Sequence, residues 1–284
     1  NWDDLGRKTG ESIHRLGSPT KYILNKTYAY NDVPGYKTSE QVYAINIRAD
    51  GYSKLLTYEY DSNGNIVKAG DIQYQYDDAG QLTQVSDPVT GTTGYVYDVG
   101  GNITSVTNSG ITKSYSYEDS LWKDLLTKYN GTDILYDAIG NPSNWRDGIT
   151  SMTWEMGRQL AGLTKNSVDH SYTYNMDNLR TSKTVGSVTT RYYWMQDKLT
   201  ASEDGVNSLY FRYDSDGTLI GFELETNQES TEYFYITNLQ GDVISIVDSD
   251  GVCVVEYSYD AWGKLLSTTG TLATSIGQLN PFRY

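Results

Sequence analysis

The sequence predicts an all-β protein made of consecutive antiparallel β-hairpins, which form one long curved or spiralling sheet. Three observations predict this class: a tyrosine motif that recurs along the chain, a turn signal at a fixed distance behind it, and the scarcity of helical periodicity. The chain has 284 residues, of which 27 are tyrosine and 27 glycine. A chain of this length can bury a sizeable core, and tyrosine rings must supply much of it.

Most of the predicted strands that open a unit carry a Tyr-x-Tyr pair. Side chains alternate between the two faces of a strand, so both rings of a pair lie on one face. The pairs are Tyr28/Tyr30, Tyr58/Tyr60, Tyr74/Tyr76, Tyr95/Tyr97, Tyr115/Tyr117, Tyr172/Tyr174, Tyr233/Tyr235 and Tyr257/Tyr259, with Phe211/Tyr213 as a close variant.

A turn signal follows the aromatic residue: Asp comes next, and Gly comes four residues after the ring. The Asp carboxylate can accept a hydrogen bond from a backbone N–H two residues on, and glycine adopts a positive φ without strain. The repeat-motif residues are Trp2, Asp3, Gly6, Tyr60, Asp61, Gly64, Tyr76, Asp77, Gly80, Tyr97, Asp98, Gly101, Tyr136, Asp137, Gly140, Tyr213, Asp214, Gly217, Tyr259, Asp260 and Gly263. We predict that they are structural.

Apolar residues begin the return strands, and degenerate units keep the turn chemistry. The predicted first apolar residues are Ile66, Leu82, Ile103, Ile220 and Leu265. Asn178 takes the glycine position after Tyr174, and Asp197 takes it after Tyr193. Asn and Asp tolerate the left-handed conformation best after glycine. The best helical candidate is the segment 120–129. A single hairpin buries too little to be stable alone, so neighbouring hairpins must stack.

Charge and composition exclude several classes of protein. The net charge of −14 argues against nucleic acid as a partner and against anionic membrane surfaces. No apolar run approaches the roughly 20 residues of a spanning helix, so we expect no membrane insertion. Aromatic residues make up 13% of the chain, which is too many for a disordered protein. A lone Cys253 allows no intrachain disulfide.

With these units in view, the chain resembles the Rhs/YD-repeat family, which includes bacterial Rhs-type toxin shells and the related teneurin shells. The segment from Tyr233 to Leu265, together with the final residues Asn280-Pro-Phe-Arg-Tyr284, is similar to the start of the Rhs-associated core region. The resemblance divides the chain into residues 1–232, with YD/Rhs repeats, and 233–284, with the last repeats and the beginning of the core region on the same sheet.

The resemblance also implies a function. Family members wind a long sheet into a hollow shell, and bacterial members enclose a C-terminal toxin domain of the same parent chain. The implied role is a section of such a shell in a bacterial protein that is secreted or at the cell surface, with flanking YD repeats as partners. On this resemblance we expect neither the toxin nor the self-cleaving residues here. We also expect an open segment with two free sheet ends.

No cofactor, metal site or catalytic group is predicted, and the chain is not expected to be an enzyme. The Asp-rich turns at 214–217 and 248–251 suggest calcium, but glycine falls at position four of the loop rather than six. Asp169, His170 and Ser171 are contiguous, and adjacent strand residues face opposite sides, so they form no triad. No cysteine–histidine cluster for zinc is present.

One alternative function stays open on the sequence alone. Aromatic rings near Asp and Asn are also typical of carbohydrate-binding surfaces, so a surface adhesion or carbohydrate-binding module is the competing reading. The regular recurrence of the rings disfavours it, because a ligand site needs a few special rings rather than one pair in every unit.

Overall fold

The structure is a computed structural model that describes residues 1–15, 22–31, 39–227 and 229–284. Over these residues the chain forms two 12-stranded sheets, and in each sheet the strands follow one another in chain order. Every neighbouring pair is antiparallel, from β1 and β2 through to β23 and β24. The predicted all-β class and the succession of hairpins are confirmed.

The first sheet contains β1 (Gly10–His14), β2 (Tyr22–Tyr30), β3 (Val42–Ala49), β4 (Tyr52–Tyr60), β5 (Ile66–Ala69), β6 (Ile72–Tyr76), β7 (Leu82–Asp87), β8 (Gly91–Tyr97), β9 (Ile103–Asn108), β10 (Ile111–Ser116), β11 (Lys128–Tyr129) and β12 (Thr132–Asp133). The second contains β13 (Ile149–Glu155), β14 (Gln159–Lys165), β15 (Val168–Tyr174), β16 (Arg180–Val185), β17 (Val188–Met195), β18 (Lys198–Glu203), β19 (Ser208–Tyr213), β20 (Leu219–Glu225), β21 (Ser230–Thr237), β22 (Val243–Asp248), β23 (Cys253–Tyr259) and β24 (Leu265–Thr269). A short helix, α1 (Ile276–Leu279), follows β24.

Backbone hydrogen bonds link the two sheets between β12 and β13. The Ser143 amide donates to the Leu135 carbonyl at 2.7 Å, and the Met152 amide donates to the Ser143 carbonyl at 2.8 Å. An isolated bridge pairs Tyr136 with Pro142. The strand succession therefore continues around the molecule through this irregular hairpin.

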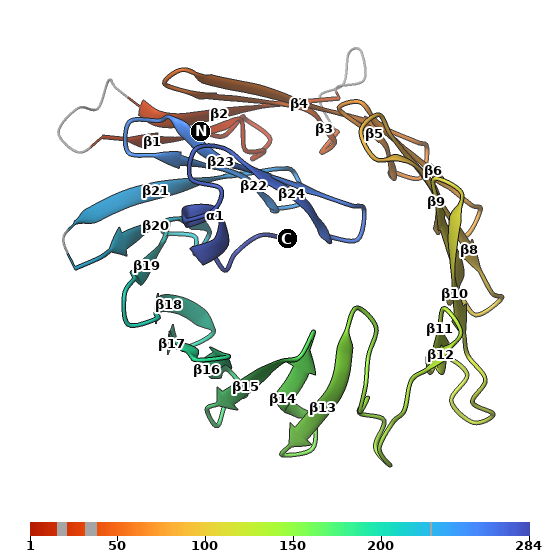
Figure 1. The fold of residues 1–284 in the computed structure, drawn as a ribbon. Helices are drawn as coiled ribbons and strands as arrows, with labels where there is room; N and C mark the ends of the chain where they lie inside the picture. The colour runs from red at the N-terminus through yellow and green to blue at the C-terminus, as the bar shows by residue number, and fades with distance from the viewer. Residues whose placement is uncertain (16–21, 32–38, 228) are drawn as a thin grey trace.

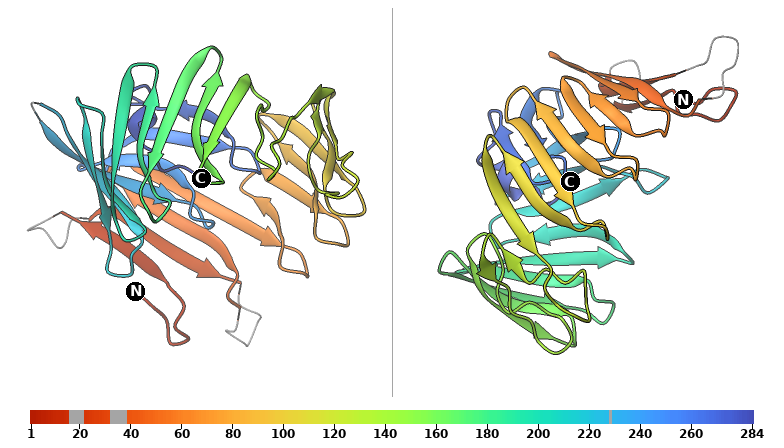
Figure 2. Two further views of the ribbon diagram at one scale, coloured as in Figure 1. Left: turned by 90° about the horizontal axis from the view of Figure 1, so that it is seen from below. Right: turned by 90° about the vertical axis from the view of Figure 1, so that its right-hand side faces the viewer.

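The sheet winds into one turn of an open spiral whose two ends overlap. In Figures 1 and 2 strands β5–β20 form the arc, and β1–β4 return to lie over β21–β23. A buried apolar cluster joins the two layers, with Ile45 and Ile47 of β3 on one side and Ile236 and Val247 of the second layer on the other. We expected two free sheet ends. The spiral is open as predicted, but the faces of its end strands cover each other.

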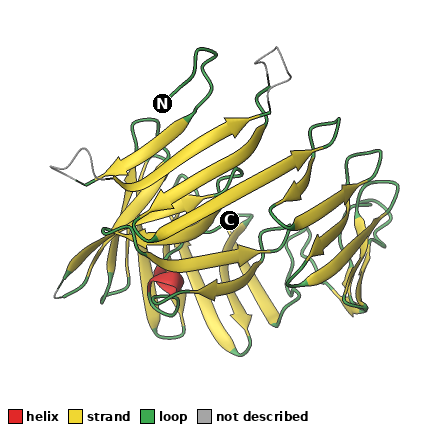
Figure 3. Cartoon of the chain, turned by 90° about the horizontal axis from the view of Figure 1, so that it is seen from above, coloured by secondary structure: helices red, strands yellow, loops and turns green. Residues whose placement is uncertain are grey.

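Strands β21–β23 are buried on both faces, which explains their apolar sequences. One face contacts β2–β4, and the other carries a second cluster that includes Phe222, Tyr235 and Ile246. The C-terminal segment with α1 packs on this second face through Ile276 and Phe282, on the inside of the spiral (Figure 1); Figure 3 draws α1 in red. Strand β22 is buried along almost its whole length, as expected for a strand that has packing partners on both sides.

The structure differs from the sequence prediction at segment 120–129. The helix predicted for 120–129 is wrong: residues 120–127 form an irregular segment with a turn at 123–124, and Lys128–Tyr129 is strand β11. The Asp119 carboxylate accepts hydrogen bonds from the Leu121 and Trp122 amides, which favours a turn. The Thr127 amide then donates to the Ser116 carbonyl, which pairs this part of the chain with the sheet. The predicted division at residue 232 falls inside β21, where the sheet continues without a break.

Candidate functional site on the inner face of the spiral

The Asp-x-x-Gly turns have one geometry throughout the chain. In each unit the Asp carboxylate accepts two backbone amides, two and four residues on; Asp77, for example, accepts those of Ala79 and Gln81, both at 2.9 Å. The predicted positive φ is present at Gly6 (75°), Gly64 (86°), Gly80 (76°), Gly101 (84°), Gly140 (83°), Gly217 (83°) and Gly263 (79°). The same bonding occupies Asp214 and Asp248, the two turns that suggested calcium.

In most units the second aromatic side chain makes a hydrogen bond that the sequence pattern did not reveal; Tyr235, which donates to the Asn280 side chain, is an exception. In the units that make this bond, the ring donates a hydrogen bond, 2.7–3.0 Å long, to a backbone carbonyl of the preceding unit, most often that of the first residue of the return strand. The pairs are Tyr30–Lys8, Tyr60–Val42, Tyr76–Ile66, Tyr97–Leu82, Tyr117–Ile103, Tyr136–Leu126, Trp154–Pro142, Tyr174–Leu160, Trp194–Arg180, Tyr213–Leu199 and Tyr259–Val243. We call this series the aromatic–carbonyl ladder.

The ladder explains why its position holds Tyr or Trp in these units and Phe in none of them. A phenol O–H and an indole N–H are both donors, whereas a phenyl ring is not. That restriction was visible in the sequence: where Phe occurs in a pair, at Phe211, it takes the first position. Most of the tyrosine pKa values in the ladder are raised, with burial as the leading cause, as for Tyr97 and Tyr259.

The ladder also corrects the alignment of one unit. We placed Tyr193 in the second aromatic position, but Tyr193 is exposed and donates to Glu203, while Trp194 makes the ladder bond. The turn there is one residue shorter, and Gln196 (φ 58°) takes the left-handed conformation predicted for Asp197. Asn178 has the predicted positive φ, 63°. The return strand after Tyr213 begins at Leu219, one residue before the predicted Ile220.

The tyrosine-bearing face of the sheet is the inner face of the spiral. Tyr95 of β8 meets Trp262 of the β23–β24 turn edge to face, with ring centroids 5.9 Å apart. Burial raises the pKa of Tyr74 to about 12, and the neighbouring Tyr284 contributes to the rise. The β23–β24 turn therefore contacts the inner face of the first sheet.

Buried polar contacts fix the C-terminal segment on the inner face. Tyr235 donates to the Asn280 side-chain oxygen at 2.6 Å, and Tyr257 donates to the Gly277 carbonyl at 3.0 Å. Phe282 packs edge to face on Phe211 with ring centroids 5.0 Å apart. These contacts explain the pattern Asn-Pro-Phe-Arg-Tyr at 280–284: its amide and its rings each contact the inner face.

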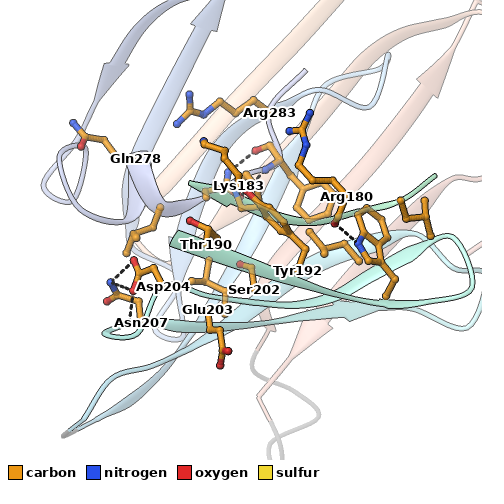
Figure 4. Close-up of a pocket in the computed structure, with 18 of the residues that line it drawn as sticks. Arg180, Lys183, Thr190, Tyr192, Ser202, Glu203, Asp204, Asn207, Gln278 and Arg283 are labelled. Carbon is orange, nitrogen blue, oxygen red and sulfur yellow. Dashed lines mark hydrogen bonds between the residues drawn. The ribbon is translucent and has the colours of Figure 1, made fainter. Parts of the chain in front are cut away.

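A groove of about 730 Å³ lies between this segment and the inner face of β16–β19. Figure 4 shows Arg180, Lys183 and Arg283 projecting on the same side of these strands. The Arg180 guanidinium stacks over the Tyr172 ring at 4.5 Å, and that of Arg283 lies 5.5 Å from the Tyr257 ring. Burial and the nearby Arg180 and Arg283 charges lower the pKa of Lys183. We call this feature the cationic groove.

The chain matches the teneurin YD-shell family model over residues 67–277, about three quarters of its length. The chain belongs to this family. The tRNA nuclease WapA of Bacillus subtilis strain 168 is 33% identical over 200 residues, which are 67% of this chain and 8% of that protein. The tRNA3(Ser)-specific nuclease WapA of Bacillus spizizenii gives the same identity and coverage. The chain thus spans only a small part of these curated relatives.

Solved structures share the YD-shell fold. The crystal structure of TcdB2-TccC3-Cdc42 superposes with a TM-score of 0.73 at 17% identity, over 100% of this chain and 16% of that one. The Photorhabdus luminescens Tc holotoxin pore with the mutation TccC3-D651A gives a TM-score of 0.69 at 17% identity, again over 100% of this chain and 16% of that chain. At these identities the likeness concerns the fold alone. The present chain is a YD-repeat shell segment related to toxin proteins.

Proposed function

We propose that this chain is a section of wall in a hollow shell that encloses a toxin domain of the same parent protein, in a bacterial protein that is secreted or at the cell surface. The observation that carries the proposal is the inner face: the sheet curves around it, the tyrosine pairs line it, and the C-terminal segment docks on it. The relatives named as nucleases are far longer than this chain, which leaves room in them for a separate domain.

We propose that the wall acts by steric exclusion and has no catalytic role. The ladder hydroxyls donate to backbone carbonyls, and the Asp carboxylates accept backbone amides, so the recurring polar groups are engaged in structure. No helix in the part of the chain that the structure describes is long and apolar enough to cross a membrane. The carbohydrate-binding alternative stays a prediction, and it would need rings outside the ladder, such as Tyr43 or Tyr210, which are exposed.

Protease protection in the parent protein tests enclosure. We expect its C-terminal domain to resist digestion in the wild type and to become sensitive when Ile236→Asp opens the overlap by burying a charge between the layers. Gln84→Lys, on the arc, is the control and should preserve protection. Equal digestion of the C-terminal domain in the wild type and in Ile236→Asp would contradict enclosure.

The absence of catalysis has a separate test. We expect the 284-residue chain to convert no RNA, ester, glycoside or peptide substrate faster than buffer. If the wild-type chain turned over one of these substrates and His170→Ala did not, the chain would be catalytic and the proposal would be wrong.

A further inference from the structure

The unit that begins at Tyr174 departs from its neighbours at two inner-face positions. The residue paired with the ladder aromatic is apolar in most units, as with Ile66, Leu82 and Ile103, but here it is Arg180. The next inner position is apolar in most units, as with Val85 and Val106, and here it holds Lys183. A purely structural role would be met by the apolar residues used elsewhere, so the two cations need another explanation.

The register shows why both cations face the groove although they lie three residues apart. A β-bulge between Thr173 and Tyr174 puts Arg180 opposite Tyr174 and Lys183 opposite Tyr172. Both therefore lie on the tyrosine face, because directly opposed residues of an antiparallel pair share a face. The C-terminal segment brings the third cation, Arg283, to the same groove.

The three cations have no acidic partner in the described ranges. No carboxylate there lies within 4.0 Å of any of them, and the buried Nε atoms of Arg180 and Arg283 have no hydrogen-bond partner. The two acids at the groove are engaged elsewhere: Glu203 with Tyr193 and Arg191, and Asp204 with Asn207. The equivalent positions of the first unit differ, because there Lys8 pairs with Glu11 at 2.5 Å.

We propose that the cationic groove is a binding site for a compact oxyanion, namely a carboxylate or phosphate group. Guanidinium groups present donors in a planar fork that fits both groups, and stacking on Tyr172 holds the Arg180 fork in place. Long polyanions are disfavoured, because the protein carries a net charge of −14 and Glu203 and Asp204 flank the groove. The oxyanion belongs either to a free small molecule or to an acidic side chain of a polypeptide that reaches the inner face.

Calorimetric titration of the 284-residue chain tests the proposal at constant ionic strength, set with chloride. Phosphate and citrate are the small-molecule probes, and a capped tri-glutamate peptide is the polypeptide probe, with tri-glutamine as its control. Binding of either class supports the site, and the class that binds identifies the source. Absence of binding by all of these anions would overturn it.

The variant Arg180→Leu/Lys183→Val separates a binding role from a structural one, because it restores residue types that neighbouring units use. We expect it to fold and to bind the anion at least about tenfold more weakly, since charge-assisted hydrogen bonds are lost. Lys165→Gln is the matched control: it also removes one positive charge, but Lys165 is exposed on β14 and is not among the residues that line the groove, so it should leave affinity unchanged. Equal affinity in the double variant and the wild type would overturn the assignment.

Discussion

The overlap of the two spiral ends and the arc between them use the same hairpin unit in different ways. In the overlap, β21–β23 are covered on both faces, and Ile236, Ile246, Val247 and Val255 have no exposed surface. Along the arc, strands such as β9 and β16 are partly exposed over their whole length. The overlap is therefore stabilised by a hydrophobic core, whereas the arc relies on devices that recur in most of its units: side-chain-capped turns, residues in the left-handed conformation and ladder bonds.

The largest difference should come from truncating apolar side chains. Ile236→Ala removes buried methyl groups between the two layers and should lower the free energy of unfolding by about 2–5 kcal/mol. Ile103→Ala in the arc, where the side chain is only half-buried, should cost less than half as much. Urea unfolding of both variants measures the contrast. Equal losses would mean that the overlap is no better packed than the arc.

Backbone strain should be the largest effect available in the arc. At Gly80 the φ of 76° disfavours β-branched residues, and no atom of the residues that the structure describes lies within 4 Å of an added Cβ, so Gly80→Val isolates strain from collision. We expect a loss of about 1–3 kcal/mol. Gln84→Lys, two residues into the next strand, should stay within about 0.5 kcal/mol of wild type. Matching melting temperatures for these two variants would refute the role assigned to the turn glycine.

The aromatic–carbonyl ladder should contribute a smaller amount at each step. Tyr97→Phe keeps the ring but removes the donor to the Leu82 carbonyl, and it should cost about 0.5–1.5 kcal/mol. Tyr210→Phe changes an exposed ring that makes no ladder bond, and it should be close to neutral. Chemical denaturation resolves the pair. If both were neutral, the ladder would be a geometric consequence of packing with no stabilising part.

Acidification should destabilise the overlap through Glu11, and this effect should be the smallest of those predicted here. Burial alone would raise the pKa of Glu11. The Lys26 charge and hydrogen bonds from Lys8 and Tyr28 outweigh burial and lower this pKa from 4.5 to about 2. A depressed pKa gives stability that is present above pH 4.5 and is lost as pH falls toward 2. Glu11→Gln should flatten this loss, by about 1 kcal/mol or less because Glu11 is partly exposed. The free energy of unfolding is measured against pH for the wild type and Glu11→Gln. The same loss of stability at low pH in both proteins would contradict this prediction.

Much of the fold follows from the sequence, because the signals that specify it are local and repeated. The Tyr-x-Tyr period and the Asp-x-x-Gly turn predict hairpins, and Gly80 and Asn178 have the predicted conformation. Segment 120–129 has apolar spacing suited to a helix, but the Asp119 turn and pairing with Ser116 prevail. Tertiary pairing of this kind lies outside what local periodicity records.

The overlap and the cationic groove depend on curvature accumulated over many units, which no single unit specifies. Ile47 and Ile236 meet only because the spiral completes a turn, and Arg283 reaches Lys183 only because the C-terminal segment folds inward. Two residues of the cationic groove could nevertheless have been identified from the sequence. Aligning the units on their ladder aromatics would have shown Arg180 and Lys183 at positions that hold apolar residues in most units.

Hydrogen exchange of the intact chain, followed by mass spectrometry, tests most directly whether the two spiral ends form one stabilising core. We predict that peptides from β3–β4 and from β21–β22 exchange most slowly and open together, because each layer buries the other, while β9–β10 exchange faster. We also predict that Ile236→Ala accelerates exchange in both β3–β4 and β21–β22 and leaves β9–β10 unchanged. Uniform protection around the spiral, or acceleration confined to β21–β22, would contradict the account.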